Sequence, residues 1–140
     1  MSTERKLPGG LRTVFRLHAV AVVLAATPLV LVPNLWAELV RWGTVDVTLA
    51  RLLGGALLAT AVGSYLASRA RTYGDVRVYL LFEQSIGTIL VLVAAYEVLL
   101  AGAPQFTWAV VAIAGAFSLA RGYYLVRAAE FEPTPGQPVP

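Results

Sequence analysis

Four long apolar segments constrain what this chain can fold into. They cover residues 13–33, 47–68, 78–101 and 106–126, and three short connections separate them. Each is close to the about 20 residues that an α-helix needs to cross a hydrocarbon core about 30 Å thick. The composition agrees, because 58% of the residues are hydrophobic, 14% are charged and the mean hydropathy is +0.71. We therefore predict an all-α polytopic membrane protein built as a four-helix bundle.

A water-soluble bundle is the competing fold, and it would need a polar face on every helix. Residues 52–66 and 110–120, however, are apolar or small nearly all round. The pattern therefore disfavours a soluble fold.

The basic residues gather near the ends of the apolar segments and predict the orientation. They are Arg5, Lys6, Arg12, Arg16, Arg69, Arg71, Arg77, Arg121 and Arg127. By the positive-inside rule these regions face the cytoplasm. We expect up-down-up-down spans with both termini cytoplasmic, in a plasma or inner membrane. A signal peptide is the competing interpretation of residues 13–33, but this run is longer than the about 7 to 15 residues of a signal core.

The two ends of the chain are polar or rich in proline, and we predict that both are disordered. Residues 1–12 form a basic tail, residues 13–128 the transmembrane domain, and residues 129–140 a proline-rich tail. Neither tail carries enough apolar surface to order itself.

The connection over residues 33–46 is the only one long enough to hold structure of its own. Asn34 is a suitable cap for a short helix at the membrane interface. In that helix Trp36, Leu39 and Val40 are expected to face lipid, because indole rings favour the headgroup level.

Small residues recur every four positions in two of the segments. They are Gly55, Ala59, Gly63 and Ala67 in the second segment and Ala112, Ala116 and Ala120 in the fourth. Small residues let helix backbones approach closely in lipid, where little hydrophobic driving force exists between helices. The stripes predict either packing within the bundle or a face for dimerisation.

A few ionisable residues interrupt the apolar segments. With about 1.5 Å of rise per residue, His18, Glu83 and Arg121 each lie roughly 7 to 8 Å inside the cytoplasmic boundary. Together with Gln84 they form a predicted inner polar cluster. By the same count Arg51 and Glu97 lie within roughly 5 Å of the outer boundary and form a predicted outer ion pair.

Two interpretations of these charges stay open. Ion pairs within a bundle fix the register of its helices. A carboxylate beside a histidine is also the usual material of a proton relay or an anion site, which makes Glu83 the sharpest functional candidate. Tyr79 lies near a segment end and is interpreted as an interfacial aromatic residue.

Several classes of function lack support in the sequence. The chain has no cysteine and one histidine, which excludes thiol chemistry and a bis-histidine haem within one chain. We expect no cofactor, no metal and no catalytic residues. The net charge is +3, but the basic residues do not form a stripe with interleaved aromatics, so we expect no nucleic-acid partner.

The run Arg51-Leu52-Leu53-Gly54-Gly55, which opens the second segment, and the lengths of the four segments resemble those of small four-helix membrane proteins of DoxX-like type. The resemblance covers residues 14–126. It implies a four-helix bundle and no particular activity, so no functional residue is carried over from it.

The sequence therefore favours a small non-enzymatic membrane protein that acts by association with other membrane subunits or with itself. One alternative is a component of a proton or small-anion transporter or channel that uses the inner polar cluster. Another is a quinone- or lipid-binding membrane enzyme.

Overall fold

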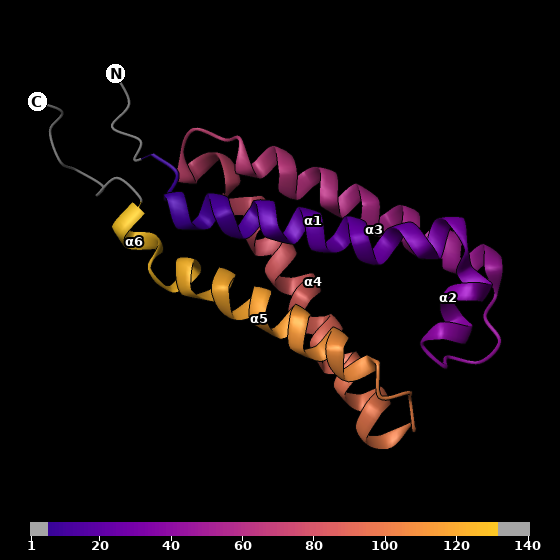
Figure 1. Cartoon of the computed structure of the whole chain (residues 1–140). Helices are drawn as coiled ribbons and strands as arrows, with labels where there is room; N and C mark the ends of the chain where they lie inside the picture. The colour runs from indigo at the N-terminus through magenta and orange to yellow at the C-terminus, as the bar shows by residue number, and fades with distance from the viewer. Residues whose placement is uncertain (1–5, 132–140) are drawn as a thin grey trace, which may run out of the picture.

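The computed structural model describes residues 6–131, which are folded almost entirely as helices (Figure 1). The helices are α1 (Gly9–Leu31), α2 (Pro33–Leu39), α3 (Val47–Ser68), α4 (Tyr73–Leu100), α5 (Thr107–Val126) and α6 (Ala128–Phe131). Four of them, α1, α3, α4 and α5, are long and apolar enough to cross a membrane. The prediction of an all-α chain with four candidate membrane helices is confirmed.

Helix α4 begins five residues before the predicted start at residue 78, because a capping box forms at its N-terminus. The backbone N–H of Asp75 donates to Thr72 Oγ1 at 3.3 Å, and the backbone N–H of Thr72 donates to Asp75 Oδ2 at 3.0 Å. These two bonds satisfy donors that a helix start leaves free. With 28 residues α4 is about 42 Å long, more than the about 30 Å of a hydrocarbon core.

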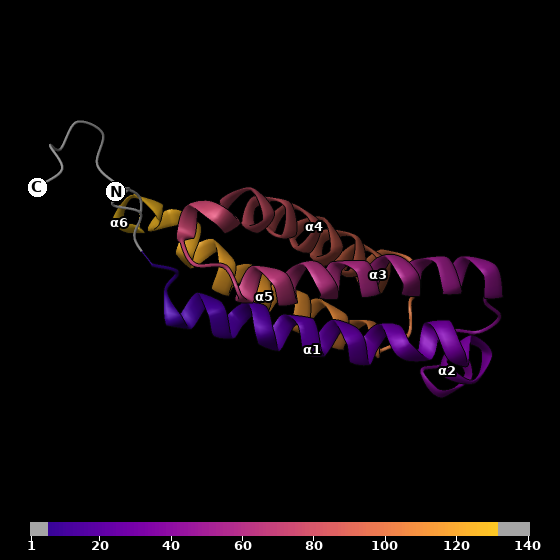
Figure 2. The same ribbon diagram turned by 90° about the horizontal axis from the view of Figure 1, so that it is seen from above.

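The four long helices form two pairs. Helix α1 packs along α3, and α4 packs along α5 (Figures 1 and 2). The first pair packs closely at Gly54, where an added Cβ atom would lie 2.6 Å from Val30 Cγ2. The two pairs meet at one end and diverge toward the other (Figure 1). We call the first end, which holds Lys6, Arg12 and the α3–α4 turn, the basic end.

The basic end contains the apolar core. Its buried residues come from the segment before α1, the first turns of α1 and α4 and the end of α3, and they are Leu7, Leu11, Phe15, Ala67, Tyr73, Val76 and Leu80. Tyr124 and Phe131 pack against this core from α5 and α6. Leu7 and Leu11 from the predicted N-terminal tail, residues 1–12, and Phe131 from the predicted C-terminal tail, residues 129–140, find apolar partners in or against this core. Residues 1–5 and 132–140 lie outside the described residues.

The opposite end, which we call the aromatic end, joins the two pairs through rings. Helix α2 has Pro33 at its first position, which suits a residue without an N–H, so Asn34 lies inside the helix and does not cap it. Trp36 lies edge-on to Phe106, with 5.6 Å between ring centroids, and the corresponding distance for Trp42 is 6.4 Å. Trp36 therefore contacts the start of α5. Leu39 is exposed, whereas Val40, which was expected to share its face, is buried.

Candidate functional site

Glu83 lies on the buried face of α4, close to where the two helix pairs meet. It is 2% exposed, and it shares this face with Leu80, Gly87 and Ala94. A carboxylate in such a position is costly unless it is paired and hydrogen-bonded. The surrounding residues therefore decide what the site can do.

Both carboxylate oxygens of Glu83 have partners, and these come from three helices. Ser64 Oγ of α3 donates to Glu83 Oε1. The Tyr79 hydroxyl, one turn earlier on α4, lies 2.7 Å from the same oxygen and 2.8 Å from the carbonyl oxygen of Thr60. Arg121 Nη1 of α5 donates to Glu83 Oε2 at 3.2 Å. The carboxylate thus ties α3, α4 and α5 together.

His18 brings α1 into the same group of residues. Its Nδ1 atom lies 2.8 Å from Ser64 Oγ and 3.3 Å from Glu83 Oε1. The imidazole also lies edge-on to Phe117, at 4.9 Å between centroids. We call His18, Ser64, Tyr79, Glu83 and Arg121 the polar network.

Gly87 makes room for the guanidinium of Arg121, which is 2% exposed. An added Cβ atom at Gly87 would lie 2.7 Å from Arg121 Nη2 and 2.6 Å from Ser118 Oγ. Gly87 follows Glu83 by one helical turn, so the same face of α4 carries both the carboxylate and the space for its partner. Within residues 6–131, Arg121 Nε and Ser118 Oγ are buried with no hydrogen-bond partner.

The structure brings together three of the four residues of the predicted inner cluster, namely His18, Glu83 and Arg121. Gln84 is not among them, because a neighbour in sequence is rotated by about 100° around a helix. Its Nε2 atom donates to Thr88 Oγ1 at 3.2 Å. The sequence interpretation missed Ser64 and Tyr79, although the four-residue spacing of Tyr79 and Glu83 places both on one helix face.

The structure does not bring the predicted outer pair together. Arg51 Nε donates to the carbonyl oxygen of Val30 at 3.3 Å, and Glu97 is exposed. No ion pair joins Arg51 to Glu97 in the described part of the chain. The physical reason is that the two helix pairs diverge toward the aromatic end, so equal depth does not place α3 beside α4 there (Figure 1).

The small-residue stripe of α3 is only partly used inside the molecule. Its last members, Gly63 and Ala67, contact Tyr79 and the core, respectively. Its first members, Gly55 and Ala59, are exposed, and an added Cβ atom at Gly55 would meet nothing within 4 Å. The buried face of α3 instead contains Gly54, Ala61 and Ser64.

On α5 the small-residue stripe also turns away from the other helices. Ala112 and Ala116 are exposed, and Ala120 is half-buried. Arg121 is buried instead, so its pairing with Glu83 sets the rotation of α5.

Residues 6–131 contain no group of three or more His, Cys, Asp or Glu side chains that could hold a metal ion. Comparison with protein-family models, with curated proteins and with solved structures finds no significant match to this chain. The resemblance to DoxX-like proteins stays a prediction.

Proposed function

We propose that this chain is a small non-enzymatic integral membrane protein that acts by association, as an accessory subunit of a membrane complex or as a homo-oligomer. The observation that carries the proposal is the outward position of Gly55 and Ala59 on α3 and of Ala112 and Ala116 on α5. In lipid, helices associate where small residues allow their backbones to approach. The internal packing leaves these faces uncovered.

The polar network supports the same proposal. Both oxygens of Glu83 are occupied by donors of the protein itself. A buried ion pair with such partners fixes how helices fit together, and it leaves the outer faces for contacts with other chains.

We further propose that the four long helices cross a plasma or inner membrane in up-down-up-down order, with both termini cytoplasmic. The charge distribution supports this orientation. The described basic side chains Lys6, Arg12, Arg69 and Arg71 belong to the basic end, whereas Glu38 and Asp46 belong to the opposite connection. Cytoplasmic loops carry such an excess of lysine and arginine.

Cross-linking in native membranes, followed by mass measurement in mild detergent, tests the association. We expect a complex larger than one chain, and we expect Gly55→Leu with Ala112→Leu to reduce it strongly, since leucine keeps two backbones apart. The matched control is Leu119→Ile, a change of shape at a side chain that is 78% exposed. A solitary monomer under all conditions, or equal loss in the control, would contradict the proposal.

A second candidate function is proton or small-anion transport through the polar network. One observation favours it: the side chain of His18 is 13% exposed and touches both Ser64 and Glu83. A titratable group therefore lies at the edge of a buried carboxylate. Proton flux into liposomes distinguishes the candidates, because Glu83→Gln abolishes flux if the network transports protons, whereas wild-type protein without flux argues for association.

A further inference from the structure

We propose that the basic end carries a binding surface for the phosphate groups of anionic phospholipids, formed by the first turns of α1 and the α3–α4 turn. Its members are Lys6, Arg12, Arg16, Arg69 and Arg71, which we call the basic patch. The inference adds a lipid ligand to the proposed protein contacts and requires only that the helices cross a membrane.

Three contacts hold the two segments of the basic patch side by side. The backbone N–H of Leu7 donates to the carbonyl oxygen of Arg71 at 2.9 Å, and Lys6 forms an isolated antiparallel bridge with Thr72. Arg12 Nη2 donates to the carbonyl oxygen of Ala70 at 3.2 Å. Cations that are about 60 residues apart in sequence therefore share one surface.

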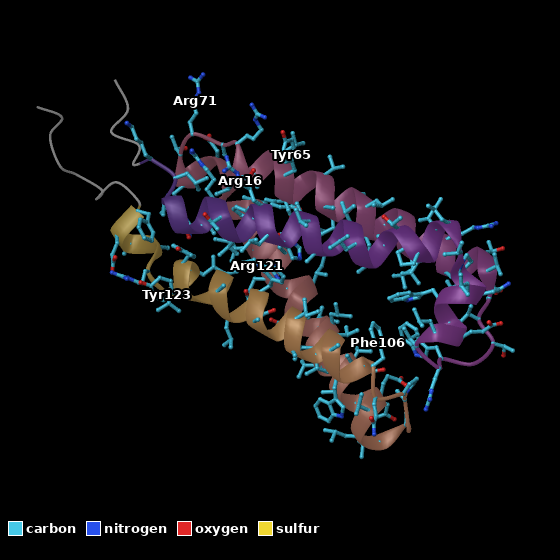
Figure 3. All side chains as sticks on the ribbon, viewed as in Figure 1. Arg16, Tyr65, Arg71, Phe106, Arg121 and Tyr123 are labelled. Carbon is cyan, nitrogen blue, oxygen red and sulfur yellow. The ribbon has the colours of Figure 1, made fainter. Side chains whose placement is uncertain are left out.

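The five cations of the basic patch outnumber the acid of the turn, Asp75, within the described part of the chain. None of its five members forms an ion pair with another residue between Lys6 and Phe131. Asp75 is the nearby acid of the turn, and its carboxylate accepts the backbone N–H of Thr72. Figure 3 shows Arg16 and Arg71 at this end of the molecule, where Arg71 projects away from the turn. Like charges that are gathered at one end of the molecule gain from an anionic partner.

The start of α1 adds to the positive potential. No side chain within residues 6–131 caps this helix, and its first turn contains no acidic residue. The free N–H groups of a helix N-terminus attract anions, and phosphate groups suit them well. This contribution has the same sign as the side chains of the basic patch.

The surroundings of the basic patch favour a lipid over a soluble anion. Leu17, next to Arg16, is 58% exposed, and Leu66, one turn before Ala70, is 61% exposed. A ligand that combines a phosphate with an apolar tail can contact both the cations and these side chains. Juxtamembrane clusters of lysine and arginine bind anionic lipid heads in this way.

Native mass spectrometry tests the proposal on the full-length protein, after incubation with equal amounts of phosphatidylglycerol and phosphatidylcholine that carry the same acyl chains. We expect the wild-type protein to retain phosphatidylglycerol over phosphatidylcholine by about fivefold or more. Arg69→Gln with Arg71→Gln should bring this ratio close to equality. The matched control, Arg41→Gln with Arg51→Gln, removes the same charge at the aromatic end and should leave the ratio unchanged.

Equal retention of the two lipids by the wild-type protein would overturn the proposal, as would an equal loss of preference in the control. If Arg69→Gln with Arg71→Gln does not fold, Arg16→Gln supplies the same test at an exposed side chain. Competition with excess inorganic phosphate distinguishes a lipid phosphate group from free phosphate as the bound anion. We expect the lipid preference to persist in its presence, and displacement of phosphatidylglycerol by phosphate would show that the surface binds a soluble anion.

Discussion

The basic end and the aromatic end of this molecule join the same two helix pairs by different means. At the basic end, Glu83 and its donors connect four helices beside a buried apolar core. At the aromatic end, Trp36 and Trp42 meet Phe106 through ring edges, and the pairs otherwise diverge (Figure 1). Apolar side chains are as well solvated by lipid tails as by each other, whereas a buried carboxylate requires its partners. The polar end therefore specifies how the pairs fit together.

The aromatic end also contains a pocket. A pocket of about 320 Å³ opens between the end of α1, α2 and the start of α3. Its lining is almost entirely apolar and comprises Leu29, Pro33, Trp36, Ala37, Trp42, Val45, Asp46, Leu49, Ala50 and Leu53. We expect this end to tolerate substitutions that the polar network does not.

The largest difference between the two ends should come from removal of a buried charge. Glu83→Leu leaves the Arg121 guanidinium buried without its counter-ion, and we expect a loss of about 3 to 5 kcal/mol in the free energy of unfolding. Denaturation in mild detergent measures this value. The control Glu97→Leu removes an exposed acid of the same helix and should change the free energy by no more than about 0.5 kcal/mol. Similar losses in both variants would remove the distinction between the ends.

A smaller loss is expected where the polar network is crowded. Gly87→Ala places a methyl group against Arg121 Nη2 and Ser118 Oγ, and we expect it to cost about 1 to 3 kcal/mol. Gly115→Ala is the matched control, because an added Cβ atom meets nothing within 4 Å there. Thermal unfolding of the two variants in the same detergent checks the prediction, and a neutral Gly87→Ala would show that Arg121 is not held against α4.

At the aromatic end, Phe106→Ala removes both ring contacts of the connection. Aromatic pairs contribute about 0.5 to 1.5 kcal/mol each, so we expect the loss of two pairs to cost about 1 to 3 kcal/mol. Tryptophan emission of a Trp108→Phe background reports the change locally, since it leaves Trp36 and Trp42 as the emitting residues. An unchanged spectrum would mean that Phe106 does not hold the connection.

The smallest effect concerns the residues that the sequence paired but the structure separates. Arg51→Gln and Glu97→Gln should each change the free energy of unfolding by no more than about 0.5 kcal/mol, and their effects should add. A double-mutant cycle measures their coupling. A coupling above about 1 kcal/mol would restore the predicted outer pair and make the two ends alike.

The sequence predicts depth along a helix better than rotation around it. Counting about 1.5 Å per residue from the segment ends brought His18, Glu83 and Arg121 to one level, and the structure places them in contact. The sequence does not show as clearly which face of a helix packs against the others, because α3 and α5 carry small or apolar residues on nearly every face. The predicted packing face of α3 was centred on Gly55, whereas the structure buries the adjacent Gly54. The prediction was therefore rotated by about 100° around the helix.

The divergence of the helix pairs has no signature within a single segment, which is why Arg51 and Glu97 were predicted to pair. Tyr79 illustrates a further limit. Its place near a segment end is typical of an interfacial aromatic residue, and only its spacing to Glu83 indicated a role in the interior. Tertiary contacts decide whether such a tyrosine lies at the membrane interface or in the interior of the bundle.

A double-mutant cycle between Glu83 and Arg121 tests most directly the claim that the polar network is what joins the two helix pairs. If the claim is correct, Glu83→Leu and Arg121→Met are each strongly destabilising, and the double variant recovers most of the loss, with a coupling of about 3 kcal/mol. Additive losses from the two substitutions would contradict it, because the carboxylate and the guanidinium would then stabilise the fold independently.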